Sequence, residues 1–128
     1  MNYINNRYPL SNETSILIGI AMEVHRILGK GFLEIVYKDA VEYEMKKRNI
    51  FYQREKEYTV TYKEIILPHK FYADFVVFDN IIVEVKAKSG IIEDHYAQTI
   101  NYLAVSKCKI GLILNFGEGS LAFKRVIF

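Results

Sequence analysis

The sequence predicts an α/β domain in which helices flank a mixed central β-sheet. Two segments with apolar residues at helical spacing come first, a block of strand-like segments follows, and a third helix precedes two further strands. Elements in this order pack as layers of helices on a sheet. The 128 residues suit a single domain spanning residues 1–128, of which residues 1–10 are expected to be loosely ordered.

The predicted helices rest on apolar residues that recur every three or four positions. Ser11 or Asn12 can cap the first helix, and Glu13 lies in its first turn. Two glycines end that helix, and a Ser-Gly break precedes the third helix. The first predicted helix runs from a cap at Ser11 or Asn12 to Leu28, and the other two span residues 33–48 and 93–106.

The predicted strands show alternation or short apolar runs that turn residues separate. Tyr58–Tyr62 alternates tyrosine or valine with threonine, and Lys63-Glu64 provides a turn before a short strand that Pro68 ends. A Gly-Glu-Gly turn precedes the last strand. The predicted strands span residues 58–62, 65–67, 71–77, 81–87, 110–115 and 121–127.

Composition argues against a membrane-spanning or disulfide-bonded protein. The longest apolar run, Ile16–Met22, is far too short to cross a bilayer, and the N-terminus lacks the basic-then-apolar order of a signal peptide. Cys108 is the only cysteine, so neither an internal disulfide nor a cysteine metal cluster is expected. The net charge of +2 is too small to indicate a polyanionic partner by itself. We expect a cytoplasmic protein that makes no membrane contact.

Three charged residues lie inside a predicted β-hairpin, where charged side chains are uncommon. Asp74 is in the first strand, and Glu84 and Lys86 share one face of the second. A two-residue loop would put Asp74 on the face opposite Glu84. A three-residue connection, which pairs Val77 with Ile81, puts all three charges on the same face.

Segregation of apolar residues favours the three-residue connection. It leaves one face mixed and charged, and it makes the other face wholly apolar. Asn80 is expected in the left-handed region of such a loop, although a bulge would give the same result. The predicted apolar face consists of Ala73, Phe75, Val77, Ile81, Val83, Val85 and Ala87.

Two interpretations fit three charges gathered on one face. The first is a cross-strand salt-bridge network. The second is a divalent-cation site, since Mg²⁺ takes oxygen ligands and typically uses one or two carboxylates together with water and phosphate. A lysine beside the cation can help to activate the attacking water and can counter the charge that develops in the transition state.

The spacing of these charges resembles the active-site motif of the PD-(D/E)XK nuclease superfamily. The motif here is Asp74, a spacer and then Glu84-Val85-Lys86, with Ala73 where many members have proline. The segment GFLEIVY (31–37) resembles the signature of the GxxExxY family, a branch of that superfamily. The segment QTINY (98–102) resembles the Q-x-x-x-Y motif of the RecB-like nucleases. The resemblance implies a restriction-endonuclease-like core with the order α-β-β-β-α-β.

The resemblance also implies a metal site and a catalytic lysine. Asp74 and Glu84 would be direct ligands of Mg²⁺, for which Mn²⁺ can substitute. Glu34 would complete or support the metal site from its helix, although an acid near a helix start also favours the helix dipole. Lys86 would be the catalytic lysine.

Three further residues receive supporting roles from the resemblance. Gln98 would hold Lys86 or a phosphate. Tyr102 would brace its helix or contact the substrate backbone, and Tyr37 would support the site or bind substrate. Each tyrosine lies three or four positions after a predicted polar site residue, so each such pair shares a helix face. His25, one turn before GFLEIVY, is expected to be structural or to support the site indirectly.

The expected function is that of a Mg²⁺-dependent nuclease that hydrolyses phosphodiester bonds in nucleic acid, with DNA favoured over RNA. The alternative is a non-catalytic nucleic-acid-binding module, or an accessory subunit of a repair or defence complex, that keeps the nuclease fold. A third interpretation is a structural protein whose charges only form a salt-bridge network. The sequence leaves open whether the enzyme is an endonuclease or an exonuclease, and whether it forms a homodimer or joins a larger complex.

Overall fold

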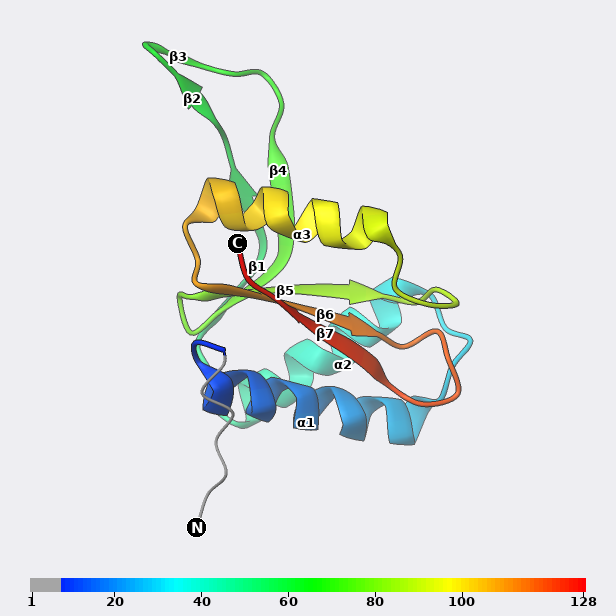
Figure 1. The fold of residues 1–128 in the computed structure, drawn as a ribbon. Helices are drawn as coiled ribbons and strands as arrows, with labels where there is room; N and C mark the ends of the chain where they lie inside the picture. The colour runs from blue at the N-terminus through cyan, green and yellow to red at the C-terminus, as the bar shows by residue number, and fades with distance from the viewer. Residues whose placement is uncertain (1–7) are drawn as a thin grey trace.

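The computed structural model describes residues 8–128, and within them it contains three helices and seven strands (Figure 1). The helices are α1 (Ser11–Leu28), α2 (Glu34–Lys47) and α3 (Glu93–Ser106). The strands are β1 (Tyr52–Tyr58), β2 (Thr61–Tyr62), β3 (Ile65–Ile66), β4 (Phe71–Val77), β5 (Ile81–Lys86), β6 (Ile110–Asn115) and β7 (Ala122–Val126).

Five strands form the central sheet in the order β1-β4-β5-β6-β7. Strands β5 and β6 pair in parallel and the other neighbours pair antiparallel, so the sheet is mixed, as predicted. The parallel pair requires a crossover, which α3 supplies. Helices α1 and α2 cover one face of the sheet and α3 covers the other (Figure 1).

The core has one part on each face of the sheet. The larger part joins α1 and α2 to the central strands, and the smaller part lies under α3. Strand β6 supplies both parts, because all six of its residues are buried. A strand covered on both faces reads as a continuous apolar run, which explains why Ile110–Asn115 was predicted with the correct bounds.

The register of the β4–β5 hairpin agrees with the prediction, since Val77 pairs with Ile81. The expectation for Asn80 is wrong, because Phe78 (φ 54°) and Asp79 (φ 61°) take the left-handed conformation instead. The Asn80 amide donates to the Val77 carbonyl at 3.2 Å and closes a tight turn with those two residues at its centre. A turn with positive φ at both central positions matches the right-handed twist of a hairpin.

The predicted apolar face of the hairpin is wrong at one position. Ala73 is buried with Val76 and Ile82 in the core under α3, whereas Phe75 packs on the side of α1 and α2. The strict alternation of β4 is therefore broken at Asp74. At this point the carboxylates of Glu84 and Asp74 accept the backbone amides of the opposite strand, and the regular pairing of β4 with β5 extends only to Phe75 and Val83.

The first strand was placed too far along the chain. The main-sheet strand is β1, Tyr52–Tyr58, and the predicted strand Tyr58–Tyr62 only overlaps its end. Strand β1 escaped prediction because it is a charged edge strand whose Arg54 pairs with Asp39 and Glu42 of α2. Between β1 and β4 the chain forms the exposed hairpin of β2 and β3, which projects past the sheet (Figure 1).

The start of α1 also differs from the prediction. The helix begins at Ser11 with Leu10 at the N-cap in a left-handed conformation, and neither Ser11 nor Asn12 provides a side-chain cap. The Thr14 amide and hydroxyl instead donate to the Leu10 carbonyl. Of the segment expected to be loosely ordered, residues 1–7 lie outside the described residues, and Tyr8 and Leu10 pack against the core. Among the described helices, none has the length and apolar character that crossing a membrane requires.

Candidate active site

A pocket of about 590 Å³ opens between the start of α2, the β4–β5 hairpin and the inner face of α3. It brings together every site residue that the sequence predicted except Tyr37. Three acids and a lysine are among the residues that line it. The lining residues are Glu34, Phe71, Asp74, Glu84, Lys86, Ala97, Gln98, Asn101 and Tyr102.

Two carboxylates occupy the point where β4 and β5 separate. Glu84 accepts a hydrogen bond from the backbone amide of Asp74 at 3.0 Å. Asp74 accepts one in return from the backbone amide of Val85 at 2.8 Å. Each carboxylate therefore takes the place of a ladder hydrogen bond and is fixed by the opposite strand. The sheet thereby places two acids side by side.

The buried Glu84 carboxylate is the electrostatically unfavourable member of this pair. Glu84 is only 3% exposed, and no ion pair reaches it within residues 8–128. Burial, followed by the repulsion from Asp74, raises the pKa of Glu84 to about 9. Burial thus favours the protonated form of Glu84 in the metal-free protein, and a cation binding there would replace that proton.

The donor set fits a hard divalent cation. Asp74 and Glu84 offer carboxylate oxygens in a pocket with room for water and phosphate, and one or two carboxylates are the usual protein ligands of Mg²⁺. Glu34 is the first residue of α2 and lines the same pocket. Across the described chain, however, no three Asp, Glu, His or Cys side chains form a metal-binding cluster. Asp74 and Glu84 are thus the close pair, and Glu34 is the more distant acid.

Lys86 of β5 and Gln98 of α3 form the contact that the family resemblance implied. The Lys86 ammonium donates to the side-chain oxygen of Gln98 at 3.0 Å. No ion pair joins Lys86 to an acid in the described part of the chain. A neutral amide therefore holds this ammonium, whose positive charge is left available to the pocket.

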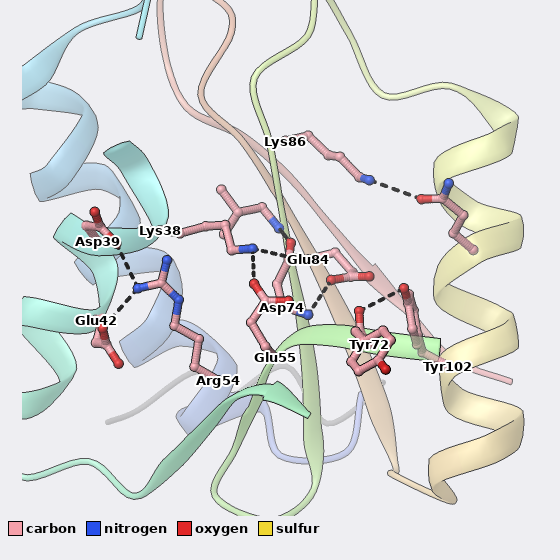
Figure 2. Close-up of polar contacts among 12 residues, drawn as sticks. Lys38, Asp39, Glu42, Arg54, Glu55, Tyr72, Asp74, Glu84, Lys86 and Tyr102 are labelled. Carbon is pink, nitrogen blue, oxygen red and sulfur yellow. Dashed lines mark hydrogen bonds and ion pairs between the residues drawn. The ribbon is translucent and has the colours of Figure 1, made fainter. Parts of the chain in front are cut away.

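Tyr102 connects α3 to the edge of the pocket. Its hydroxyl donates to the backbone carbonyl of Tyr72 at 2.9 Å, and the residue lines the pocket (Figure 2). Burial, reinforced by the charges of Glu84 and Asp74, raises the pKa of Tyr102 to about 12. The hydroxyl thus stays protonated and ties the helix to β4.

Tyr37 and His25 lie outside the pocket and hold the scaffold behind it. The buried Tyr37 hydroxyl donates to the Gly29 carbonyl at 2.6 Å and accepts from the Phe32 amide at 3.2 Å. Its ring stacks on Phe116 at 4.6 Å between centroids. The His25 ring bonds to the Glu118 carbonyl and also stacks on Phe116. Tyr37 thereby fixes the loop that leads into the first turn of α2.

Lys38 is the residue of the site that the sequence analysis missed. Its ammonium contacts Asp74 at 3.0 Å and also bonds to Glu55 of β1 (Figure 2). Lys38 lies four residues after Glu34 and therefore on the same face of α2, which was a signal in the sequence. The salt-bridge interpretation is thus partly right for Asp74, but it does not account for Glu84 or Lys86.

A mixed five-stranded sheet between helices, with paired acids and a lysine where two central strands separate, defines a restriction-endonuclease-like domain. A model of the PD-(D/E)XK nuclease superfamily matches residues 11–126. The chain therefore belongs to the PD-(D/E)XK nuclease superfamily. Proteins of this superfamily are generally nucleases that use divalent metal ions.

One solved structure illustrates the fold at low sequence identity. The chain is similar to a protein described as "Crystal structure of SSO0001", with a TM-score of 0.59 and 17% identity. The match covers 73% of this chain and 50% of that one, so this chain spans about half the length of its structural neighbour. No sequence among the curated proteins matches.

Proposed function

We propose that this chain is a divalent-metal-dependent nuclease that hydrolyses phosphodiester bonds, with Mg²⁺ or Mn²⁺ as cofactor and DNA as the favoured substrate. One observation carries the proposal: Asp74, Glu84 and Lys86 line a single pocket although they come from two strands. Two acids supply oxygen ligands for a cation, and a lysine supplies a positive charge for a phosphate.

Each residue has a definite task in this proposal. Asp74 and Glu84 hold the cation, which when bound polarises the phosphate and lowers the pKa of water. Glu34 supports that site from the start of α2. Lys86 orients the attacking water or stabilises the charge on a phosphate oxygen. Gln98 fixes the Lys86 ammonium, since the two side chains already share a hydrogen bond.

We further propose that the chain belongs to the GxxExxY branch, with RecB-like features on α3. The support is that two residues of GFLEIVY have different roles, one in the loop before α2 and one at the pocket. Tyr37 holds the loop between Gly29 and Phe32, and that loop sets where α2 begins. Glu34, as the first helical residue, is thereby placed at the pocket. In this proposal Tyr37 is a support for the site and not a substrate contact.

We propose that a polymeric substrate runs along a second hollow. It measures about 390 Å³ and shares Asn101 with the pocket, so the two adjoin along α3. No acid lines it, in contrast to the pocket, and Lys107 is its charged residue. The sugar-phosphate backbone would pass from the acidic pocket into this hollow, since hydroxyl, amide and ammonium groups are common phosphate contacts. The lining residues are Thr59, Val60, Thr61, Asn101, Ala104, Val105 and Lys107.

A non-catalytic nucleic-acid-binding module, or an accessory subunit of a repair or defence complex, remains the second candidate. The absence of a three-acid cluster within residues 8–128 favours it, as does the ion pair that already neutralises Asp74. Metal titration separates the two candidates. The nuclease binds Mn²⁺ and turns over, whereas the module retains DNA without turnover.

The experiment is a cleavage panel of labelled single-stranded, duplex and branched DNA and RNA with Mg²⁺ or Mn²⁺. Wild type is compared with Lys86→Ala and with Lys46→Ala, a matched loss of charge at an exposed position of α2. We expect Lys86→Ala to lower the cleavage rate about 100-fold and Lys46→Ala to leave it unchanged. DNA retention without cleavage by wild type would favour the binding module. Equal rates for wild type and Lys86→Ala would remove Lys86 from the mechanism.

A further inference from the structure

Lys38 places an ammonium group next to a predicted metal ligand. Its side chain is only 11% exposed and lies on the inner face of α2. The ammonium contacts the Asp74 carboxylate at 3.0 Å and bonds to Glu55 at the same time (Figure 2). A buried lysine is rare unless its charge is paired, and here both acids pair with the Lys38 ammonium.

The Lys38 ammonium remains charged in this position. The carboxylates of Glu55 and Asp74 both accept hydrogen bonds from it and balance its charge. A permanent positive charge therefore sits on one oxygen of Asp74, while the other oxygen accepts the Val85 amide. A divalent cation approaching Asp74 meets a like charge already in place.

Glu55 offers Lys38 a second partner and is held in an unusual conformation to do so. Arg54 and Glu55 are neighbours in β1, and both bond to side chains of α2. Simple strand alternation would send them to opposite faces. Glu55 instead has φ 53°, a left-handed conformation that is strained for a non-glycine residue. Backbone strain of this kind is typical of functional positions, and here it accompanies the contact between Glu55 and Lys38.

We propose that Lys38 is a positioning residue that acts as an internal counter-cation, pairing with Asp74 when no metal is bound and with Glu55 alone when a divalent cation occupies Asp74. The inference rests on the proposed metal site. It assigns Glu55, which the pocket does not include, to the same machinery. Lys38 then stabilises the metal-free protein and weakens metal binding, whereas Glu55 favours metal binding.

The test measures Mn²⁺ affinity by calorimetry without substrate, together with thermal unfolding without metal. We expect Lys38→Gln to bind Mn²⁺ about tenfold more tightly than wild type and to unfold at a lower temperature without metal. Lys46→Gln removes the same charge from an exposed position of α2 and should change neither quantity. A merely structural Lys38 would lower the unfolding temperature without tightening Mn²⁺ binding.

A second variant keeps the inference testable if Lys38→Gln does not fold. Glu55 has a half-exposed side chain on an edge strand, so Glu55→Gln should fold. We expect it to weaken Mn²⁺ binding several-fold more than Glu57→Gln, which removes the same charge two residues along β1. The inference, but not the proposed metal site, would be overturned if Glu55→Gln and Glu57→Gln had equal effects. The same would follow if Lys38→Gln bound Mn²⁺ no more tightly than wild type. Failure of wild type to bind Mn²⁺ would overturn the proposed metal site as well.

Discussion

Asp74 and Glu84 are joined by two hydrogen bonds across the β4–β5 hairpin, each carboxylate accepting an amide from the opposite strand. The Glu84 carboxylate takes the Asp74 amide, and the Asp74 carboxylate takes the Val85 amide. A central ladder is interrupted so that two acids can converge.

Glu84→Gln should stabilise the metal-free protein increasingly as pH rises. The folded pKa of Glu84 is raised to about 9, while an unfolded glutamate titrates near its ordinary value, so between about pH 4.5 and 9 unfolding releases a proton. Stability of wild type is therefore lost across that window. A neutral amide can still accept the Asp74 amide, and the expected gain is on the order of 1 kcal/mol or more at pH 8.

Urea unfolding of wild type and Glu84→Gln between pH 5 and pH 8, with chelator present, measures this difference. The control is Glu57→Gln, an exposed acid on β1. Parallel stability curves for wild type and Glu84→Gln would show that burial of this carboxyl does not strain the fold.

Replacement of Gln98 should distinguish the effect of the orientation of Lys86 on the cleavage rate from the effect of its charge. Gln98→Ala removes the group that holds the Lys86 ammonium but leaves the charge, so we expect the cleavage rate to fall about tenfold, less than for Lys86→Ala. Gln98 is exposed, and folding should be unaffected. Initial rates on one good substrate at saturating Mg²⁺ provide the measurement, with the exposed Gln53→Ala as control. A Gln98→Ala rate equal to wild type would exclude this positioning role.

Tyr37→Phe should destabilise the fold more than Tyr102→Phe. The hydroxyl of the buried Tyr37 makes two hydrogen bonds, to Gly29 and Phe32, and its loss should cost about 1–2 kcal/mol. Tyr102 makes a single bond to Tyr72 in a more exposed place, so a smaller loss is expected. The urea midpoint of each variant is compared with that of Tyr43→Phe, a tyrosine that is 61% exposed. The reverse order would show that the loop before α2 does not depend on Tyr37.

Gly117→Ala should be far more damaging than Gly119→Ala on the same turn. A Cβ at Gly117 would lie 2.2 Å from the backbone oxygen of Lys88, whereas nothing lies within 4 Å of one at Gly119. The Lys88 segment follows the strand that carries Lys86 and is bonded to Asn115 on both sides, so it cannot move away easily. We expect a loss of about 2 kcal/mol for Gly117→Ala by thermal unfolding. Similar melting temperatures for the two variants would mean that the turn adjusts freely.

The parts of the fold that could be predicted are those with strong local patterns. The helix Glu93–Ser106 and the buried strand Ile110–Asn115 have the predicted bounds because periodicity and burial act together there. The pairing of Val77 with Ile81 followed from keeping apolar residues on one side of the sheet. The same reasoning failed at Ala73, because alternation assumes a regular ladder and the ladder is interrupted next to the site.

Other features depend on tertiary contacts that no local pattern shows. Strand β1 is charged, and its Arg54 is balanced by acids of α2 that are distant in sequence. The left-handed conformation of Glu55 and its bond to Lys38 arise from the same packing. The motif residues were found because their order along the chain resembles a known family, whereas Lys38 lies outside that motif.

The most direct test of the central claim is a crystal structure of the protein with Mn²⁺, located by anomalous scattering. The claim predicts one peak in the pocket with carboxylate oxygens of both Asp74 and Glu84 within about 2.6 Å, and with the Lys38 ammonium withdrawn from Asp74. A pocket without a peak, or a peak elsewhere while Lys38 stays on Asp74 and Glu84 keeps only its backbone partner, would contradict it.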